Sequence, residues 1–381
     1  MTINMKKLKI AFICIYSHPS ICGVWSRVYN LSEMLIKKGH EVHVFSTNII
    51  KGTSENSSSS QICNGIKIHR FAPKASFGEN IRFWNFSSEL EHLNPDFIIA
   101  EVYRHPHTSL SLKIAKKLNK PCFLVTHAPF VEPELRSRFG NLIANFYDRF
   151  YGKKIINKFD KIITITSWEI PYLLNLGVNP KKMVYIPNGI PERFFRKKRI
   201  KGKNLLFLGR ISPVKNLESL ILAMPSVIKN NPHVKLRIAG PSESNYLKKL
   251  LILVNDLKVE KSVEFLPAVY DLDKKIDLID SSEIFILPSK REAMPQSLIE
   301  AMSRGKIVIA SDNKGSSEII SNGKTGFLFQ ISDSKQLAGR INYCLDNKNS
   351  GVLSKIRKNA IIKSQNFKWG KIFTKFCSLL K

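Results

Sequence analysis

Two glutamates eight positions apart form the most informative chemical pattern in this 381-residue chain. Glu292 is expected to follow an apolar strand, and Glu300 to lie inside a helix that Pro295 can open, because proline suits a first helical turn. At ~1.5 Å per helical residue, the two carboxylates can be up to about 12 Å apart. A hydrolytic acid/base pair needs roughly 5 to 9.5 Å. The wider spacing instead favours gripping two sugars of one ligand, with phosphates between them at the helix N-terminus, and so predicts a sugar nucleotide.

A second set of polar residues follows another expected strand, 204–208. Gly209 at the strand end lets a ligand approach the backbone, Arg210 offers a forked set of donors, and Lys215 offers a compact charge. Both cations suit a diphosphate. Loop cations alone are mostly solvated, but the same domain also carries the strand–Glu–helix–Glu pattern. The two sets together therefore favour a phosphate-containing ligand.

Short β-branched runs alternate with helical segments along the chain, which is typical of parallel sheets built from βα units. Strands are expected at 9–16, 42–46, 66–70, 97–100, 122–126, 161–166 and 184–186, and then at 204–208, 234–239, 263–265, 283–287, 307–310 and 326–329. The clearest helix is 24–38, because Gly39 follows it and glycine commonly terminates helices. Further helices are expected at 216–230, 244–256, 295–304, 333–346, 351–364 and 367–380.

This pattern predicts two Rossmann-like, doubly wound α/β domains with a cleft between them, and ligands bound beyond the carboxyl ends of the strands. The expected boundaries are an N-terminal domain over 1–190, a basic linker over 191–203, and a second domain over 204–364. A C-terminal helix over 365–381 could pack back on the N-terminal domain.

Charge is the second clue, because 60 lysines and arginines against 30 acidic residues give a formal net charge of +30. Such a charge attracts polyanions: nucleic acid, anionic lipid or phosphorylated substrates. Basic residues crowd 193–203, and they alternate with aromatic residues over an expected helix at 135–159. This interleaving suits an anionic membrane surface; a lysine-rich solvated surface is the alternative. No apolar run approaches the ~20 residues that span a bilayer, and six cysteines without a C-x-x-C pair indicate free thiols and a cytoplasmic protein.

Together these residues resemble the family 4 glycosyltransferases, which are retaining enzymes of the GT-B fold. The resemblance covers nearly the whole chain, and it implies that the domain over 1–190 binds the acceptor and that the domain over 204–364 binds the nucleotide sugar. It is carried by E-x7-E (Glu292, Glu300), G-R-x-x-x-x-K (Gly209, Arg210, Lys215), Pro187-Asn188-Gly189 and Asn322-Gly323-x-x-Gly326-Phe327. It implies that Glu300 binds the ribose hydroxyls, that Glu292 binds the transferred sugar, and that Arg210 and Lys215 neutralise the diphosphate. Backbone amides of Met294, Gln296, Ser297 and Leu298 can face a phosphate, whereas Pro295 supplies none.

The resemblance also assigns residues in the N-terminal domain. Gly23 matches the glycine-rich first βα loop of the family, in which Cys22 takes the place of a second glycine. His127 ends a strand and matches the histidine of many relatives; a lone histidine at a strand end is more often structural, but the match favours a hydrogen-bond donor to the transferred sugar. Arg27 is a further candidate for contact with the donor phosphate or the acceptor.

The expected function is a cytoplasmic, retaining hexosyltransferase that uses a UDP- or GDP-sugar or similar donor and a saccharide or lipid-linked acceptor, in cell-envelope or surface-glycan synthesis. Neither a cofactor nor a metal is expected, because Arg210, Lys215 and a helix N-terminus take the place of the metal. Asp271-Leu272-Asp273 spells a metal-binding D-x-D, but its position predicts a helix cap instead. The alternatives are a sugar-nucleotide epimerase of the same fold and a basic nucleic-acid-binding protein, although no RNA or DNA motif is recognisable.

Overall fold

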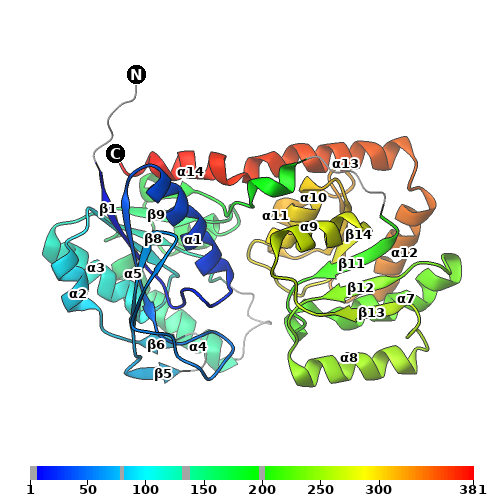
Figure 1. Cartoon of the computed structure of the whole chain (residues 1–381), viewed down its shortest axis with the longest axis horizontal. Coiled ribbons are helices and arrows are strands. Elements are labelled where there is room, and N and C mark those ends of the chain that lie inside the picture. The colour runs from blue at the N-terminus through cyan, green and yellow to red at the C-terminus, as the bar shows by residue number, and fades with distance from the viewer. Residues whose placement is uncertain (1–6, 78–80, 131–137, 197–201) are drawn as a thin grey trace. The chain divides into compact units, whose positions relative to one another are not determined.

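The computed structural model describes residues 7–77, 81–130, 138–196 and 202–381. It divides into two compact units, one formed by Met1–Pro187 with Ile372–Lys381 and the other by Asn188–Lys371 (Figure 1). The chain therefore passes from one unit to the other twice. Four basic residues of the expected linker (Lys197, Lys198, Arg199 and Lys201) and positions 135–137 of the expected basic helix lie outside the described residues.

The first unit contains an eight-stranded sheet in the order β10-β9-β8-β7-β1-β2-β4-β3, in which β3 alone is antiparallel to its neighbour. Its strands are β1 (Lys9–Ile13), β2 (Glu41–Thr47), β3 (Ser60–Cys63), β4 (Ile66–Phe71), β7 (Phe97–Glu101), β8 (Cys122–Val125), β9 (Lys161–Thr164) and β10 (Met183–Tyr185). The strand order reverses between β1 and β7, so the loops that follow these strands meet at a switch point where ligands bind in such sheets.

Every strand expected in this half is present, but β3 and a separate two-stranded antiparallel sheet of β5 (Ala75–Phe77) and β6 (Ile81–Phe83) were not predicted. These strands are short and largely exposed, so they lack a buried apolar pattern. The helices are α1 (Gly23–Lys37), α2 (Ser87–Leu93), α3 (Pro106–Leu118), α4 (Arg138–Phe146), α5 (Lys153–Ile156) and α6 (Ile170–Asn175), with a π-helical segment at Tyr147–Gly152 between α4 and α5.

The ends of α1 are set by local chemistry. Cys22 is its N-cap, with the Sγ atom accepting from the backbone N–H of Trp25 at 3.5 Å. Gly39 follows the C-cap with a φ of 88°, the left-handed conformation that glycine adopts without strain. The helix end predicted at Gly39 is therefore confirmed.

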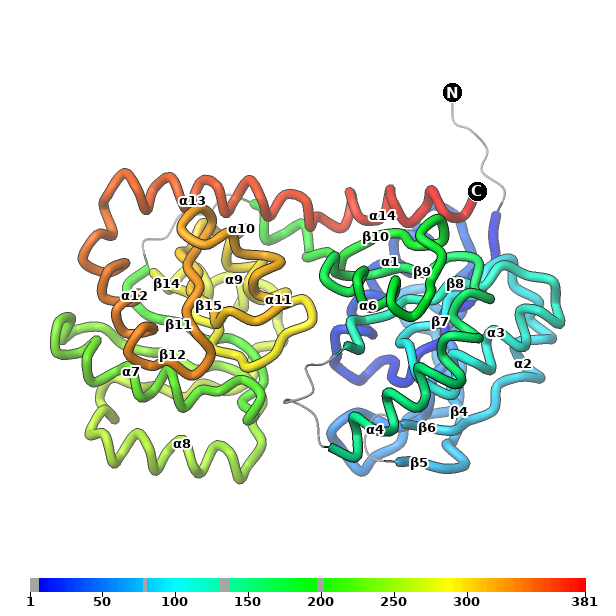
Figure 2. The backbone as a smooth tube through the Cα atoms, turned by 180° about the vertical axis from the view of Figure 1, so that it is seen from behind, coloured from blue at the N-terminus to red at the C-terminus, as the bar shows by residue number. Residues whose placement is uncertain are grey.

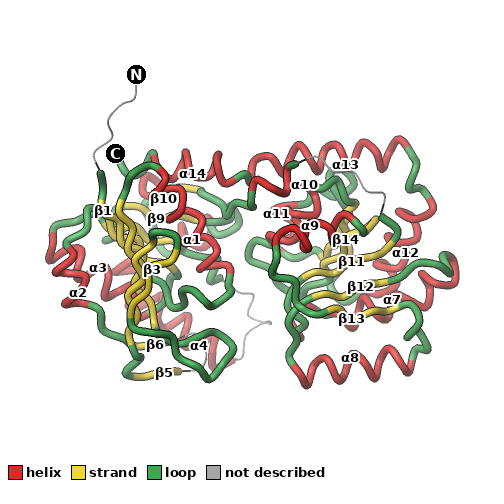
Figure 3. The backbone as a smooth tube through the Cα atoms, viewed as in Figure 1, coloured by secondary structure: helices red, strands yellow, loops and turns green. Residues whose placement is uncertain are grey.

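The second unit contains a six-stranded parallel sheet in the order β13-β12-β11-β14-β15-β16, with helices on both faces (Figure 3). Its strands are β11 (Asn204–Leu208), β12 (Leu236–Ala239), β13 (Val263–Leu266), β14 (Ser282–Leu287), β15 (Ile307–Ser311) and β16 (Phe327–Phe329). Its helices are α7 (Leu217–Asn230), α8 (Ser244–Asp256), α9 (Leu272–Asp280), α10 (Gln296–Ser303), α11 (Lys314–Ile319), α12 (Ser334–Asp346) and α13 (Gly351–Ser364). The order reverses between β11 and β14, and the predicted phosphate-binding and glutamate loops follow these two strands.

Two local predictions have different outcomes in this unit. Asp271 caps α9, because its Oδ1 accepts from the backbone N–H of Lys274 at 2.8 Å, as predicted. Pro295 was expected inside the first turn of a helix, and this is wrong by one residue: it is the N-cap of α10, in an extended conformation. In that place its fixed φ leads into the helix, and the first helical N–H belongs to Gln296.

The last helix, α14 (Trp369–Cys377), begins in the second unit and ends in the first. Within the first unit, the end of α14 lies beside β10 (Figure 2), where the Lys375 ammonium lies over the ring of Tyr185. The ring of Phe376 stacks on that of Phe12 in β1 with centroids 6.2 Å apart. Phe12 and Phe376 are fully buried. Residues near the end of the sequence therefore complete the core around its first strand.

Candidate active site

An ion pair joins the two loops at the switch point of the second unit. The Nζ atom of Lys215 lies 2.6 Å from Oε1 of Glu292, which also accepts from the Ser289 hydroxyl at 2.6 Å. Both charged side chains are largely buried. Glu292, which is predicted to bind a sugar, thus lies against Lys215, which is predicted to bind a diphosphate. Each side chain neutralises the charge of the other.

The loop that carries Glu292 is held in place by backbone contacts. Asn313, which caps α11, and Ser311 at the end of β15 both donate to the carbonyl oxygen of Ser289, the Asn313 amide at 2.9 Å. A Cβ atom on Gly315 would lie 2.5 Å from the Glu292 carbonyl oxygen, a clash with backbone that cannot move aside cheaply. Only glycine therefore permits this close packing of α11 on the glutamate loop.

Glu300 lies on α10 with only 4% of its surface exposed. The Nζ atom of Lys275, on α9, lies 2.7 Å from Oε1 and 2.6 Å from Oε2 of this carboxylate, and 5.5 Å from the ring centre of Phe194. A buried charge is costly without a partner, and Lys275 supplies that partner. No sequence motif identifies Lys275, because a lysine on a helix is usually solvated.

The N-terminus of α10 offers backbone donors. Leu298 N–H donates to the Pro295 carbonyl at 3.2 Å, so this predicted phosphate-facing amide is already in use. The N–H groups of Gln296 and Ser297 donate to no acceptor among the described residues. Met294 accepts through Sδ from Asn188 N–H at 3.2 Å, which anchors the residue before the helix. Two open donors at the positive end of a helix suit an anion.

Arg210 follows β11 and is exposed, and its guanidinium pairs with no carboxylate that the structure describes. Gly209 before it donates to the Ala239 carbonyl at 3.0 Å and is backed by Gly240, whose φ is 149°. A Cβ at Gly240 would lie 1.9 Å from the Gly209 carbonyl oxygen. The backbone at the end of β11 is therefore packed tightly against Gly240. The guanidinium of the exposed Arg210 keeps its N–H donors available to a ligand.

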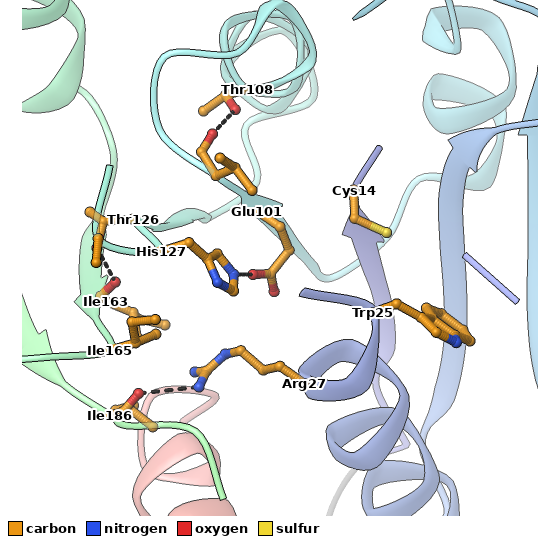
Figure 4. A network of polar contacts seen from close by, with 12 residues as sticks. Cys14, Trp25, Arg27, Glu101, Thr108, Thr126, His127, Ile163, Ile165 and Ile186 are labelled. Atoms are coloured by element: carbon orange, nitrogen blue, oxygen red, sulfur yellow. Dashed lines mark hydrogen bonds and ion pairs between the residues drawn. The ribbon is translucent and has the colours of Figure 1, made fainter. Parts of the chain in front are cut away.

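In the first unit, the sequence-predicted His127 follows β8. Its Nε2 atom lies 2.5 Å from Oε2 of Glu101, a fully buried carboxylate at the end of β7 (Figure 4). Arg27, from α1, is also fully buried and points toward the same place; its Nη1 donates to the carbonyls of Ile186 and Pro187, both at 3.2 Å. Burial lowers the pKa of Arg27, and the negative charges of Glu101 and Glu169 oppose this shift.

The backbone is strained around His127. Four residues other than glycine have left-handed φ angles in the loops after β7 and β8: Val102 (76°), Arg104 (69°), His127 (58°) and Ala128 (51°). Such conformations cost on the order of 1–3 kcal/mol each and persist only when neighbours enforce them. The positive φ is most unusual at Val102, because β-branched residues rarely adopt this conformation. Strain of this type concentrates at functional sites.

Glu169 enforces the geometry of the His127 loop. Its buried carboxylate accepts from the Thr126 hydroxyl at 2.5 Å and from Ala128 N–H at 2.8 Å, on both sides of His127. It also accepts from Ile165 N–H and from the backbone and hydroxyl of Thr166. Burial raises the pKa of Glu169, and these hydrogen bonds oppose the rise. The carboxylate thus ties the loop after β8 to the segment after β9.

The predicted donor-site glycine, Gly23, is the first residue of α1. A Cβ atom there would meet nothing within 4 Å beyond the adjoining backbone, so the space on that side of Gly23 is open. Sequence reasoning identified Gly23 and His127 but missed Glu101. The available signal was an acidic residue directly after the apolar run 97–100, at the carboxyl end of a parallel strand.

Comparison with known proteins decides the family. The model for "Glycosyl transferases group 1" matches residues 191–364, and the model for "Glycosyltransferase Family 4" matches residues 21–194. The chain belongs to the group 1 glycosyltransferases. An uncharacterized glycosyltransferase of Methanocaldococcus jannaschii is 26% identical over 390 residues and covers 96% of both chains.

Two other relatives of this group 1 glycosyltransferase carry informative names. The phosphatidyl-myo-inositol mannosyltransferase of Mycolicibacterium smegmatis is 23% identical, covering 88% of this chain and 84% of its own. An Escherichia coli enzyme named UDP-Gal:alpha-D-GlcNAc-diphosphoundecaprenol alpha-1,3-galactosyltransferase is 26% identical, covering 69% and 71%.

Solved structures agree on the fold. A glycosyltransferase from Rickettsia africae superposes with a TM-score of 0.76 at 19% identity, covering 99% of this chain and 98% of its own. Anabaena HepE in complex with UDP and glucose gives 0.73 at 19% identity, covering 98% and 99%. This group 1 glycosyltransferase therefore has the GT-B fold, as predicted.

Proposed function

We propose that the protein transfers a hexose from a UDP-, GDP- or similar nucleotide sugar to a saccharide or lipid-linked acceptor, with retention of anomeric configuration. The observation that carries this proposal is the second-unit site: a buried Glu300 beside open helix N–H groups, with Arg210 and Lys215 on the neighbouring loop. The UDP and glucose in the HepE complex support the choice of ligand. The family match favours transfer over the epimerase and nucleic-acid alternatives.

Each residue has a role in this proposal. Glu300 accepts from the two vicinal ribose hydroxyls, because an ionised carboxylate is an acceptor with two oxygens. Arg210, Lys215 and the N–H groups of Gln296 and Ser297 stabilise the charge that develops on the departing diphosphate. Glu292 accepts from hydroxyls of the transferred sugar once Lys215 turns to the phosphate. His127 hydrogen-bonds to the transferred sugar.

The reaction follows from these roles without a covalent enzyme intermediate. The bond between the anomeric carbon and the phosphate oxygen breaks, the acceptor oxygen bonds to the same face of that carbon, and the acceptor proton passes to the departing phosphate. The three cationic or dipolar groups do the work that a metal ion does in other transferases. No resident cofactor is required.

We expect nucleoside diphosphate to be released from the donor only when acceptor is present, and to the same extent with EDTA. Product release is measured by chromatography with UDP- and GDP-sugars and a panel of saccharide and lipid-linked acceptors. Conversion of the donor sugar to its epimer without acceptor would instead establish an epimerase. Loss of turnover in EDTA with recovery in manganese would contradict the metal-independent account.

We place the acceptor at an anionic membrane surface, on the cytoplasmic face, because of an apolar stripe along α4 and the segment after it. Five large apolar side chains recur there at helical spacing and are half or more exposed: Phe139, Leu142, Ile143, Phe146 and Phe150. Exposed basic residues flank them: Arg138, Arg149, Lys153 and Lys154. An outward apolar face with flanking cations suits the interface of an anionic bilayer. The lipid names of two relatives support this choice.

No helix in the described part of the chain is long and apolar enough to cross a membrane.

Replacing Phe139 and Phe146 together with serine is expected to weaken binding to vesicles rich in anionic lipid by about 100-fold or more, because burial of each phenylalanine side chain in the interface contributes roughly 1.5–3 kcal/mol. Vesicle flotation measures the bound fraction. The matched control replaces Leu251 and Ile252, two exposed apolar residues on α8, and should leave binding unchanged. Binding that ignores lipid charge and both double variants alike would remove the membrane from the proposal.

A further inference from the structure

Two histidine–carboxylate pairs occur in the described part of the first unit, and they differ in surroundings. Glu41 accepts from His43 Nε2 at 2.9 Å on β2, is partly exposed and also pairs with Lys67. Glu101 is fully buried at the end of β7, where its Oε2 lies 2.5 Å from His127 Nε2. The second pair stands at the sheet switch point, beside the strained loop that carries a predicted active-site histidine.

Packing alone does not account for Glu101. Its Oε1 atom accepts no hydrogen bond from the residues that the structure describes. An incompletely hydrogen-bonded carboxylate in a buried position destabilises a fold relative to an apolar side chain of similar size. The charge of Arg27 offsets part of this cost. Among the described residues, the one hydrogen-bonded contact that the structure gives for this carboxylate is with the His127 ring.

We propose that Glu101 is a positioning residue for His127. An ionised carboxylate only accepts hydrogen bonds, so its contact places the ring proton on Nε2 and fixes the tautomer and orientation of the imidazole. The ring atom left for a ligand is then Nδ1, which in the neutral ring accepts from a sugar hydroxyl. This replaces the donor role expected from the sequence with an acceptor role, and it rests on the proposed contact of His127 with the transferred sugar. Arg27, fully buried on α1, is the counter-charge of the arrangement.

The expected result is a non-additive pair of variants. Glu101→Gln keeps the shape of the side chain and should lower kcat/KM by about 10- to 100-fold, the range typical when the hydrogen-bond partner of a metal-ligating histidine is lost. His127→Ala should lower it at least as much, and the double variant should be no worse than His127→Ala alone, because residues that act through one another are not additive. Glu41→Gln removes the other histidine–carboxylate contact and should leave kcat/KM unchanged.

A spectroscopic measurement tests the same point without turnover. Long-range proton–nitrogen NMR spectra of histidine-labelled protein should show His127 as the Nε2-protonated tautomer, identified by the signal missing from His127→Ala. That signal should change in Glu101→Gln and stay unchanged in Glu41→Gln. If Glu101→Gln does not fold, Glu101→Asp, which withdraws the carboxylate by one methylene, should shift the His127 signal.

Three outcomes would overturn the proposal: an Nδ1-protonated His127 in the native protein, an unchanged His127 signal in the Glu101 variants, or a Glu101→Gln effect that persists in full in the His127→Ala background. A failure of the proposed function would give a different result. Full activity of His127→Ala would remove the sugar contact, while the NMR result would still report whether Glu101 sets the tautomer.

Discussion

Replacing Glu300 with glutamine is expected to weaken binding of a nucleoside diphosphate about 100-fold. The native carboxylate is almost completely buried, and in the proposed donor complex it accepts from both ribose hydroxyls. Hydrogen bonds to a charged group are worth roughly 1.5–3 kcal/mol each, and a loss of ~2.7 kcal/mol corresponds to this change in Kd. Isothermal titration calorimetry gives the Kd directly. The rise in melting temperature that the nucleotide confers on the native protein should nearly disappear.

Asp280 provides the matched control for this variant. It is a buried acid of the same unit, 1% exposed and paired with Arg304. It is the last residue of α9, whereas Lys275, the partner of Glu300, lies near the start of that helix. Asp280→Asn should lower the melting temperature and leave nucleotide affinity unchanged. Native affinity in Glu300→Gln would show that the ribose binds elsewhere, whereas equal losses in the two variants would mean that general destabilisation is the cause.

Replacing Lys215 with methionine is expected to lower kcat by about 10²–10³-fold, with a much smaller effect on the affinity for the donor. The ammonium is paired with Glu292 before the ligand binds. Its charge matters most when the bond to the diphosphate breaks, and removing one such stabilising donor typically costs this factor. Steady-state kinetics with saturating acceptor separates kcat from KM.

Lys117→Met is the control for the loss of an ammonium from an ion pair. Lys117 pairs with Glu91 at 2.6 Å on the surface of the first unit and should be dispensable for turnover. The double variant Lys215→Met with Glu292→Gln tests whether an unpaired Glu292 causes the defect. A Lys215→Met enzyme with raised KM and native kcat would assign Lys215 to ground-state binding alone.

The sequence predicted the strands and helices well, and it also predicted the main residues of the second-unit site. The βα alternation placed every strand of the second sheet, because parallel strands buried on both faces appear as continuous apolar runs. It also placed Glu292, Glu300, Arg210 and Lys215 on neighbouring loops and a helix, where the structure has them.

The contacts that organise the site could not be predicted in this way. Lys275 meets Glu300 across 25 positions, Glu101 meets His127 across 26, and Glu169 meets Ala128 across 41. Local periodicity describes which face of an element is buried, but it does not specify which polar residue of one element meets a polar residue of another. The Lys215–Glu292 pair was missed for the same reason, although both of its members had been singled out.

The fully buried stacking partner of Phe12 is Phe376, and this has a consequence for biosynthesis. Residues 188–371 form a unit of consecutive sequence, whereas the first unit also needs residues 372–381. At ~5–20 residues per second, a ribosome takes on the order of ten to forty seconds to make the intervening segment. During that interval the nascent first unit presents an unfilled apolar site beside β1, the kind of surface that chaperones bind. The half that is translated first is therefore the half that matures last.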